Sequence, residues 1–289
     1  MPEATLPATG MPFRTLQRFF RTPKGLLIIV FALLIPLAAA RGGFAVVAPG
    51  LAAAAIVSML VDAPILRLRE KAWQFPDGAL LTGLIVAMVL SPHEPWYVPG
   101  VTAAVGVLSK YAIRIRRANV FNPAALALVA TFYVFGTGQS WWGALPDLPL
   151  PALTVLFATG LYITARVRKM PSVLAFLGVY YLLFTATSFV GDPRHVVAIY
   201  REPDLHASLF FAFFMVTDPP TSPPGPRDQV VFGAVTAAVS YAAYQIIGAA
   251  YFLLAGLLVA NVWEAWRRDR VRERRRTLIS AGRDQYLRV

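Results

Sequence analysis

Four polar segments interrupt an otherwise apolar chain and carry the side chains that could build a binding site. They run from Phe75 to Gly83, from Ser109 to Tyr111, from Asn119 to Ala124 and from Phe214 to Pro223. Polar groups that enter membrane segments are costly, so they indicate function by default. The candidate binding residues are Asp77, Gly78, Thr82, Gly83, Lys110, Asn122, Pro123, Thr217, Asp218, Thr221 and Ser222.

These residue types suit hydrogen bonding to a flat ligand, and none of them is expected to be catalytic. Glycines allow close approach, and helices beginning near Asp77 and Asn122 would expose free backbone N–H groups. The carbonyls and ring nitrogens of an isoalloxazine ring accept such bonds, but a small solute would satisfy the same groups. A metal site is not expected, because His93, His195 and His206 are few and far apart.

Each segment also has a purely structural interpretation. Asp77 could cap a helix, and Pro123 after Asn122 could occupy the first turn of another. Pro219 and its neighbours could simply end a helix, and Lys110 could be one more cytoplasmic cation. The four segments share one side of the topology predicted below, and this favours a single converging site.

The elements that must position these residues are predicted to be membrane helices. The chain is 57% hydrophobic and 15% charged, with a mean hydropathy of +0.58, whereas soluble domains are about 25% charged. The pattern predicts an all-α polytopic membrane protein with ten transmembrane helices. The third, fifth and eighth are shorter than the ~20 residues of a full crossing and are expected to be half-helices or re-entrant segments. The predicted spans are 25–40, 43–64, 78–91, 96–112, 121–136, 152–167, 172–190, 205–217, 229–247 and 249–266.

Positive charge orients these spans. The net charge is +12, and the ten-span topology places 24 of the 27 Lys and Arg residues on one side, leaving Arg41, Arg194 and Arg201 on the other. The positive-inside rule makes the basic side cytoplasmic. Both termini are therefore expected in the cytoplasm of a bacterium, with the chain in the inner membrane. The same distribution predicts contact with membrane lipid and no nucleic-acid partner.

An internal repeat accompanies the span pattern. One constant offset aligns Pro76-Asp77 with Pro203-Asp204 and Met88-Val89 with Met215-Val216. Each half holds five spans, so the halves are expected to be inverted, with a site between them. The repeat also argues against reading residues 11–40 as a cleaved signal peptide. The expected divisions are an arm (1–24), a first repeat (25–136), an outward loop (137–151), a second repeat (152–266) and a basic tail (267–289).

The polar segments resemble those of a known membrane family. The pieces are Asp77-Gly-Ala-Leu-Leu-Thr-Gly-Leu-Ile-Val-Ala-Met88, Ser109-Lys-Tyr, Val120-Phe-Asn-Pro-Ala124, and Phe214-Met-Val-Thr-Asp-Pro219 with Thr221-Ser-Pro223. They are similar to the RnfD subunit of the Rnf ion-translocating electron-transport complex and to the NqrB subunit of the sodium-translocating NADH:quinone reductase. The resemblance implies an inverted-repeat scaffold, a complex with other membrane and cytosolic subunits, and flavins.

The resemblance also implies which flavin to expect. Family members hold one flavin non-covalently near the segment that is Asn122 here, and attach FMN to a threonine of a Ser-Gly-Ala-Thr motif in the outward loop. That motif is absent, and only Thr137 and Thr154 lie near its place. We therefore expect a non-covalent flavin, riboflavin or FMN, and no covalent FMN. The alternative function is a solute channel or transporter on the same scaffold. The chain has no cysteine, which excludes thiolate-bound iron–sulfur clusters on this chain alone.

Overall fold

The computed structural model describes residues 18–71, 73–116, 118–146, 148–190, 197, 199–201 and 203–286, with side chains described up to residue 273 except that of Leu150. Most of the expected N-terminal arm, and Arg194 of the expected outward cations, lie outside these residues. The helices are α2 (Pro23–Gly42), α3 (Phe44–Glu70), α4 (Asp77–Val89), α5 (Tyr97–Ala112), α6 (Pro123–Phe135), η1 (Trp142–Ala144), α7 (Leu150–Arg166), α8 (Met170–Val190), α10 (Asp204–Phe210), the π-helical turn η2 (Phe211–Met215), α11 (Pro226–Ile247) and α12 (Phe252–Tyr286). A two-stranded hairpin, β1 (Arg114–Ile115) and β2 (Ala118–Asn119), joins α5 to α6.

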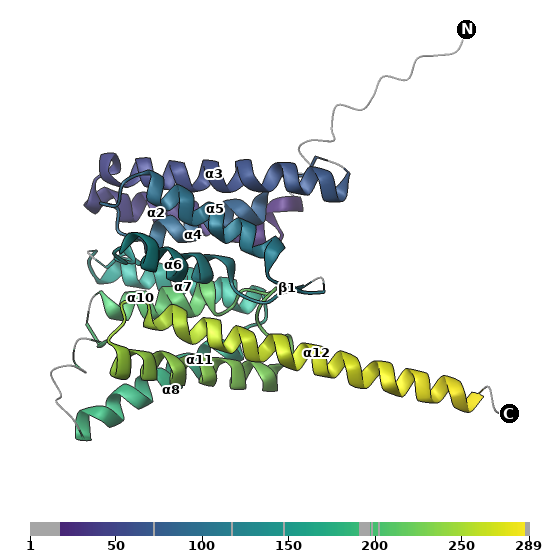
Figure 1. Cartoon of the computed structure of the whole chain (residues 1–289). Coiled ribbons are helices and arrows are strands. Elements are labelled where there is room, and N and C mark those ends of the chain that lie inside the picture. The colour runs from purple at the N-terminus through teal and green to yellow at the C-terminus, as the bar shows by residue number, and fades with distance from the viewer. Residues whose placement is uncertain are drawn as a thin grey trace, which may run out of the picture.

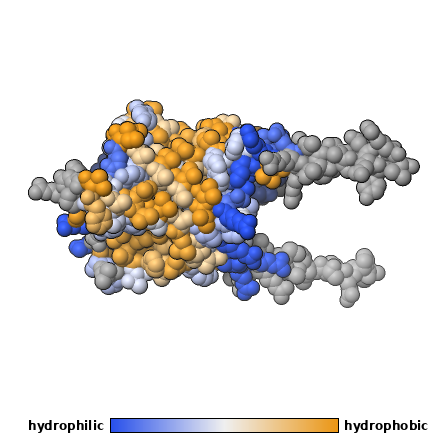
Figure 2. Space-filling view, turned by 90° about the horizontal axis from the view of Figure 1, so that it is seen from below, coloured by the Kyte–Doolittle hydropathy of each residue, from blue (hydrophilic) through white to orange (hydrophobic). Residues whose placement is uncertain are grey.

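The fold is an all-α bundle whose helices lie side by side (Figure 1). In the part of the chain that the structure describes, four helices, α2, α3, α8 and α11, are long and apolar enough to cross a membrane. The helices α4 and α6, and the segment Asp204–Met215, are apolar but shorter. Figure 2 shows a broad hydrophobic surface that gives way to hydrophilic residues toward the end of the bundle from which α12 projects. The expectation of an all-α integral membrane protein is therefore confirmed.

Contacts between helix ends define a basic end of the bundle. Lys24 at the start of α2 pairs with Asp77 at the start of α4, at 2.7 Å. Arg166 at the end of α7 donates a hydrogen bond to the Arg21 carbonyl, at 3.3 Å. Lys110 at the end of α5 lies close to Gly78. The beginnings of α2 and α4 and the ends of α5 and α7 thus share one end of the bundle.

Different contacts gather the other helix ends at the opposite end. After α4, the Ser91 amide donates to the Gly138 carbonyl, at 2.8 Å. Tyr133, near the end of α6, hydrogen-bonds Tyr251, just before α12. His206, near the start of α10, contacts the Ala144 carbonyl at 2.9 Å. The helix α2 therefore runs away from the basic end, whereas α12 returns to it and continues outward (Figure 1).

Helix starts in the two parts of the chain are regularly spaced. The helices α2 and α7 begin at Pro23 and Leu150, and α4 and α10 begin at Asp77 and Asp204. The two intervals are equal, and they match the offset of the repeat in the sequence. The packing is also alike, since α3 packs against α5 and α8 against α11.

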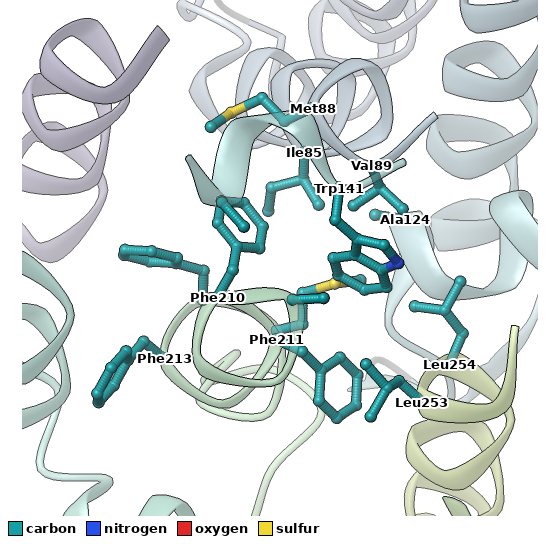
Figure 3. Packing of buried hydrophobic residues seen from close by; sticks show 14 of the residues in the cluster. Ile85, Met88, Val89, Ala124, Trp141, Phe210, Phe211, Phe213, Leu253 and Leu254 are labelled. Carbon is teal, nitrogen blue, oxygen red and sulfur yellow. The ribbon is translucent and has the colours of Figure 1, made fainter. Parts of the chain in front are cut away.

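Aromatic and aliphatic side chains fill the space between the two parts of the chain. Phe210 and Phe211 each lie 6.2 Å from the ring of Trp141. Figure 3 shows these rings between Ile85 of α4 and Leu253 of α12. The short helices α4 and α10 thus bury their apolar side chains in one shared core. This packing stabilises helices that are too short to be stable in isolation.

One element extends further than its apolar run. The sequence pattern predicted that the last span ends at residue 266, but α12 continues as helix to Tyr286. The residues after Trp266 are rich in Arg and Glu, which favour helix as well as most apolar residues do. Loss of hydrophobicity therefore marks the end of the apolar run, whereas the helix itself continues.

Candidate binding cavity

A cavity of about 620 Å³ opens at the basic end; we call it the basic-end cavity. Eight of the candidate residues line it: Asp77, Gly78, Thr82, Lys110, Asn122, Pro123, Thr217 and Asp218. Its apolar part is formed by Leu27, Leu81, Ile85, Ile163, Val167 and Phe214. Residues from α2, α4, α5, α6, α7 and the 214–220 segment thus meet around one space, whose volume is typical of ~300–1,000 Å³ ligand sites.

The start of α4 brings cations to the cavity. Lys24 Nζ lies 2.7 Å from Asp77 Oδ1. A Cβ atom placed on Gly78 would lie 3.7 Å from Lys24 Nζ and 3.8 Å from Lys110 Nζ. Thr82 donates its hydroxyl hydrogen to the Gly78 carbonyl at 2.8 Å, so that hydroxyl is left as an acceptor. The first turn of α4 therefore faces two ammonium groups.

The start of α6 is fixed by an amide cap. Asn122 Oδ1 accepts a hydrogen bond from the Ala125 amide at 3.0 Å, and Pro123 occupies the first helical position. This is the capping interpretation of the sequence, and it coexists with a position on the cavity wall. Among the described residues, no hydrogen bond is found for Asn122 Nδ2 or the Ala124 amide. Both donors are left for a ligand.

The segment after η2 forms a tight turn beside the cavity. Asp218 Oδ2 accepts from the Thr221 hydroxyl at 2.8 Å, and the Asp218 carbonyl accepts from the Ser222 hydroxyl at 2.7 Å. Thr217 donates to the Phe213 carbonyl at 2.6 Å. Burial raises the pKa of the Asp218 carboxyl, and the hydrogen bond from Thr221 opposes that shift. Thr221 and Ser222 therefore shape the turn and do not line the cavity.

Lys169 secures this turn from the α7–α8 connection. Its buried ammonium donates to the Ser222 carbonyl at 3.1 Å and to the Pro223 carbonyl at 2.7 Å. Burial lowers the pKa of Lys169 to about 8, although the charge of Asp218 opposes the shift. From the sequence, this lysine was interpreted only as a cytoplasmic cation.

Gly83 has a packing role and does not line the cavity. A Cβ atom there would lie 2.5 Å from the Ala54 carbonyl and 2.6 Å from Ser58 Oγ, both on α3. Such distances are not sterically possible without moving a helix. Gly83 therefore allows α3 and α4 to pack closely, whereas Gly78 faces the cavity.

Helix α12 supplies residues that the sequence pattern did not single out. Asn261 Oδ1 accepts a hydrogen bond from the backbone N–H of Asn122 at 2.8 Å, and Asn261 Nδ2 donates to the Thr221 carbonyl at 3.2 Å. Arg268 donates to the Asn119 carbonyl at 3.0 Å and to the Pro220 carbonyl at 2.9 Å. These two side chains join the segments before α6 and after η2.

Glu264 pairs with two arginines on the next turn of α12. Its carboxylate is fully buried and lies 2.8 Å from Arg267 Nε and 3.5 Å from Arg268 Nε. Asn261, Glu264 and Arg268 are spaced by three and four positions and so share one helix face. Asn261 and Glu264 lie at that spacing inside the last apolar run. From the sequence alone, this pair could have indicated a polar helix face that contacts the site.

The opposite end of α4 is closed by the loop after α6. The Ser140 and Trp141 amides donate to the Val89 carbonyl at 3.0 and 3.1 Å. Trp142 Nε1 donates to the Ala87 carbonyl at 2.6 Å. The loop thereby satisfies the last carbonyls of α4, which would otherwise lack partners. A smaller cleft of about 210 Å³ lies beside it, and Arg41 and His93 are among its lining residues.

The polar groups of the basic-end cavity match a ligand with an apolar or flat body and a polar edge. The described residues contain no group of three or more His, Cys, Asp or Glu able to hold a metal ion. The available donors are backbone and amide N–H groups and ammonium groups, and the acceptors include Asp77, Thr82 and Asp218. An isoalloxazine ring fits this donor set and the apolar lining.

Comparison with known proteins gives a consistent picture. Residues 17–156 match the sequence model of a family described as NQR2, RnfD, RnfE. The D subunit of the ion-translocating oxidoreductase complex of Aliivibrio salmonicida is 33% identical over 94 residues, which are 31% of this chain and 26% of that protein. The protein of the same name from Salmonella newport is 34% identical over 106 residues, 35% of this chain and 29% of the relative.

A third relative matches over a longer stretch. The D subunit of the proton-translocating ferredoxin:NAD(+) oxidoreductase complex of Clostridium ljungdahlii is 23% identical over 159 residues, 53% of this chain and 47% of that protein. In all three comparisons the chain spans less than half the length of the relative.

Proposed function

We propose that this chain, whose residues 17–156 match the NQR2, RnfD, RnfE family, is a membrane subunit of an ion-translocating electron-transport complex. In this role it provides a non-covalent flavin site and part of an ion path, and it depends on other membrane and cytosolic subunits for its electron donor and acceptor. The supporting observation is the basic-end cavity, where four separate polar segments meet against an apolar lining.

The residues of the cavity would divide the work of holding a flavin. Asn122 Nδ2 and the Ala124 amide would donate hydrogen bonds to the ring edge. Leu81, Ile85 and Phe214 would cover its apolar part and exclude water. A bound flavin would accept and pass on electrons there.

The scaffold we propose has ten crossings in two inverted halves, with both termini in the cytoplasm of a bacterial inner membrane. It is supported by the opposite directions of α2 and α7, whose starts are related by the repeat offset, and by the short helices α4 and α10. Reporter fusions at Arg288 and within residues 192–203 should report opposite sides of the membrane. If both fusions report the same side, the topology is wrong.

The flavin is tested on the purified full-length protein by its visible absorbance spectrum, with flavin quantified in the supernatant after denaturation. The variant Asn122→Asp keeps the cap oxygen for Ala125 but loses the Nδ2 donor, so flavin retention should fall while the protein remains folded. A protein without flavin that transports a small solute into vesicles would instead support a channel on this scaffold.

A further inference from the structure

Lys110 is a partly buried cation without a direct partner among the described residues. No carboxylate of the described chain lies within 4.0 Å of its ammonium, and no hydrogen bond is found for it. Lys24, in contrast, pairs with Asp77, and Lys169 bonds two carbonyls. Removing a charge from water without a partner is costly, so this group calls for an explanation.

The acids nearest to Lys110 are engaged elsewhere. Asp62 accepts a hydrogen bond from Tyr111 at 2.7 Å, Asp77 is paired with Lys24, and Asp218 accepts from Thr221. None of these three carboxylates lies within 4.0 Å of the Lys110 ammonium. The lysine charge therefore remains available to an anion in the cavity.

The Lys110 ammonium lies beside the first turn of α4. Its ammonium and that of Lys24 lie 3.8 and 3.7 Å from the point where a side chain on Gly78 would begin. Glycine leaves this space open beside the first turn of α4, whose free amides and dipole also favour an anion. No hydrogen bond is found for the Gly78 amide among the described residues.

The cavity lining combines charged and apolar side chains. Lys24, Asp77 and Lys110 meet beside the start of α4, Asp218 is a further charged lining residue, and Leu27 and Ile85 are among the apolar ones. A ligand with an apolar body and one anionic tip would match the two ammonium groups and the apolar lining.

We propose that Lys110, with Lys24 and the start of α4, forms a subsite for the phosphate group of the cavity's ligand. The inference rests on the proposed flavin site. It specifies FMN, in preference to riboflavin, as the flavin bound there. A phospholipid headgroup carries the same chemistry, and the experiment separates the two sources.

The full-length protein, stripped of ligand in detergent, is titrated with FMN and with riboflavin while flavin fluorescence is followed. The wild type should bind FMN about tenfold more tightly or better, the effect of charge-assisted hydrogen bonds. Lys110→Met should abolish this preference by weakening FMN binding about tenfold. Lys110→Arg should retain the preference, and Lys71→Met, an exposed lysine outside the cavity, should leave it unaltered.

The outcomes are distinguishable. Equal binding of the two flavins overturns the flavin-phosphate subsite but leaves the flavin site standing, whereas binding of neither overturns the proposed function. Phospholipid is measured in the same preparations by mass spectrometry before stripping. Phospholipid that is retained by the wild type and lost in Lys110→Met assigns the subsite to a lipid phosphate. No preference together with no such lipid refutes the subsite.

Discussion

Asn261 joins the segment before α6 to the segment after η2, and we call these two segments the rim of the basic-end cavity. Replacing Asn261 by leucine should loosen this rim, because both connecting hydrogen bonds come from its amide side chain. The side chain is fully buried, and its two bonds go to the Asn122 amide and the Thr221 carbonyl. Leucine has a similar size but can make neither bond, so both backbone groups lose their partner. Each buried group left without a partner costs ~1–3 kcal/mol, so the variant should lose ~2–6 kcal/mol at this site.

The cost can appear as lost stability or as a rim that relaxes, and both are measurable. The purified variant should unfold at a lower temperature than the wild type, and its affinity for flavin should fall at least about tenfold if ~1.4 kcal/mol of the loss affects the bound state. Val262→Leu is the matched control, since Val262 is the next residue and is 49% exposed on the surface of α12. Unchanged melting and unchanged flavin affinity in Asn261→Leu would refute the bridging role.

Three further predictions concern helix packing, the pH dependence of stability and covalent flavin. Gly83→Ala should destabilise the protein by ~1–3 kcal/mol because it forces α3 from α4, whereas Gly178→Ala, which meets no atom within 4 Å, should be neutral or stabilising in the same melting assay. Because the pKa of Lys169 is lowered from 10.5 to about 8, the unfolded chain binds more protons than the folded one between these two values. The wild type should therefore gain stability relative to Lys169→Met as pH rises through that window, and a constant difference in melting temperature would contradict it. In-gel fluorescence after denaturation should show no covalent flavin in cells expressing a flavin transferase, since Thr137 is buried and Thr154 lies within α7; a fluorescent band mapping to either threonine would overturn this expectation.

The sequence predicted the cavity wall better than its support. Asp77, Asn122 and Asp218 were recognisable because polar residues beside apolar runs are rare and costly. Their convergence followed from topology, because the predicted spans placed all of them toward the same membrane side. The short helix beginning at Asp204 was also expected, from the short apolar run at 205–217.

Other roles could not be read without three-dimensional contacts. A glycine that faces a cavity and one that permits helix packing have the same sequence signature, so Gly78 and Gly83 were grouped together although they point to different neighbours. Lys169 and Arg268 were counted as topological charges, because a rule based on charge does not distinguish a solvated cation from one that bonds carbonyls.

The length of α12 gives the cavity rim a mechanical connection to the proposed cytoplasmic side. The helix continues from Arg268 to Tyr286, which is about five turns at ~3.6 residues per turn, and Figure 1 shows it projecting from the bundle. Asn261 and Arg268 fasten the same rod to both rim segments. A partner that bound the projecting helix and tilted it would therefore act on both rim segments at once through these two side chains.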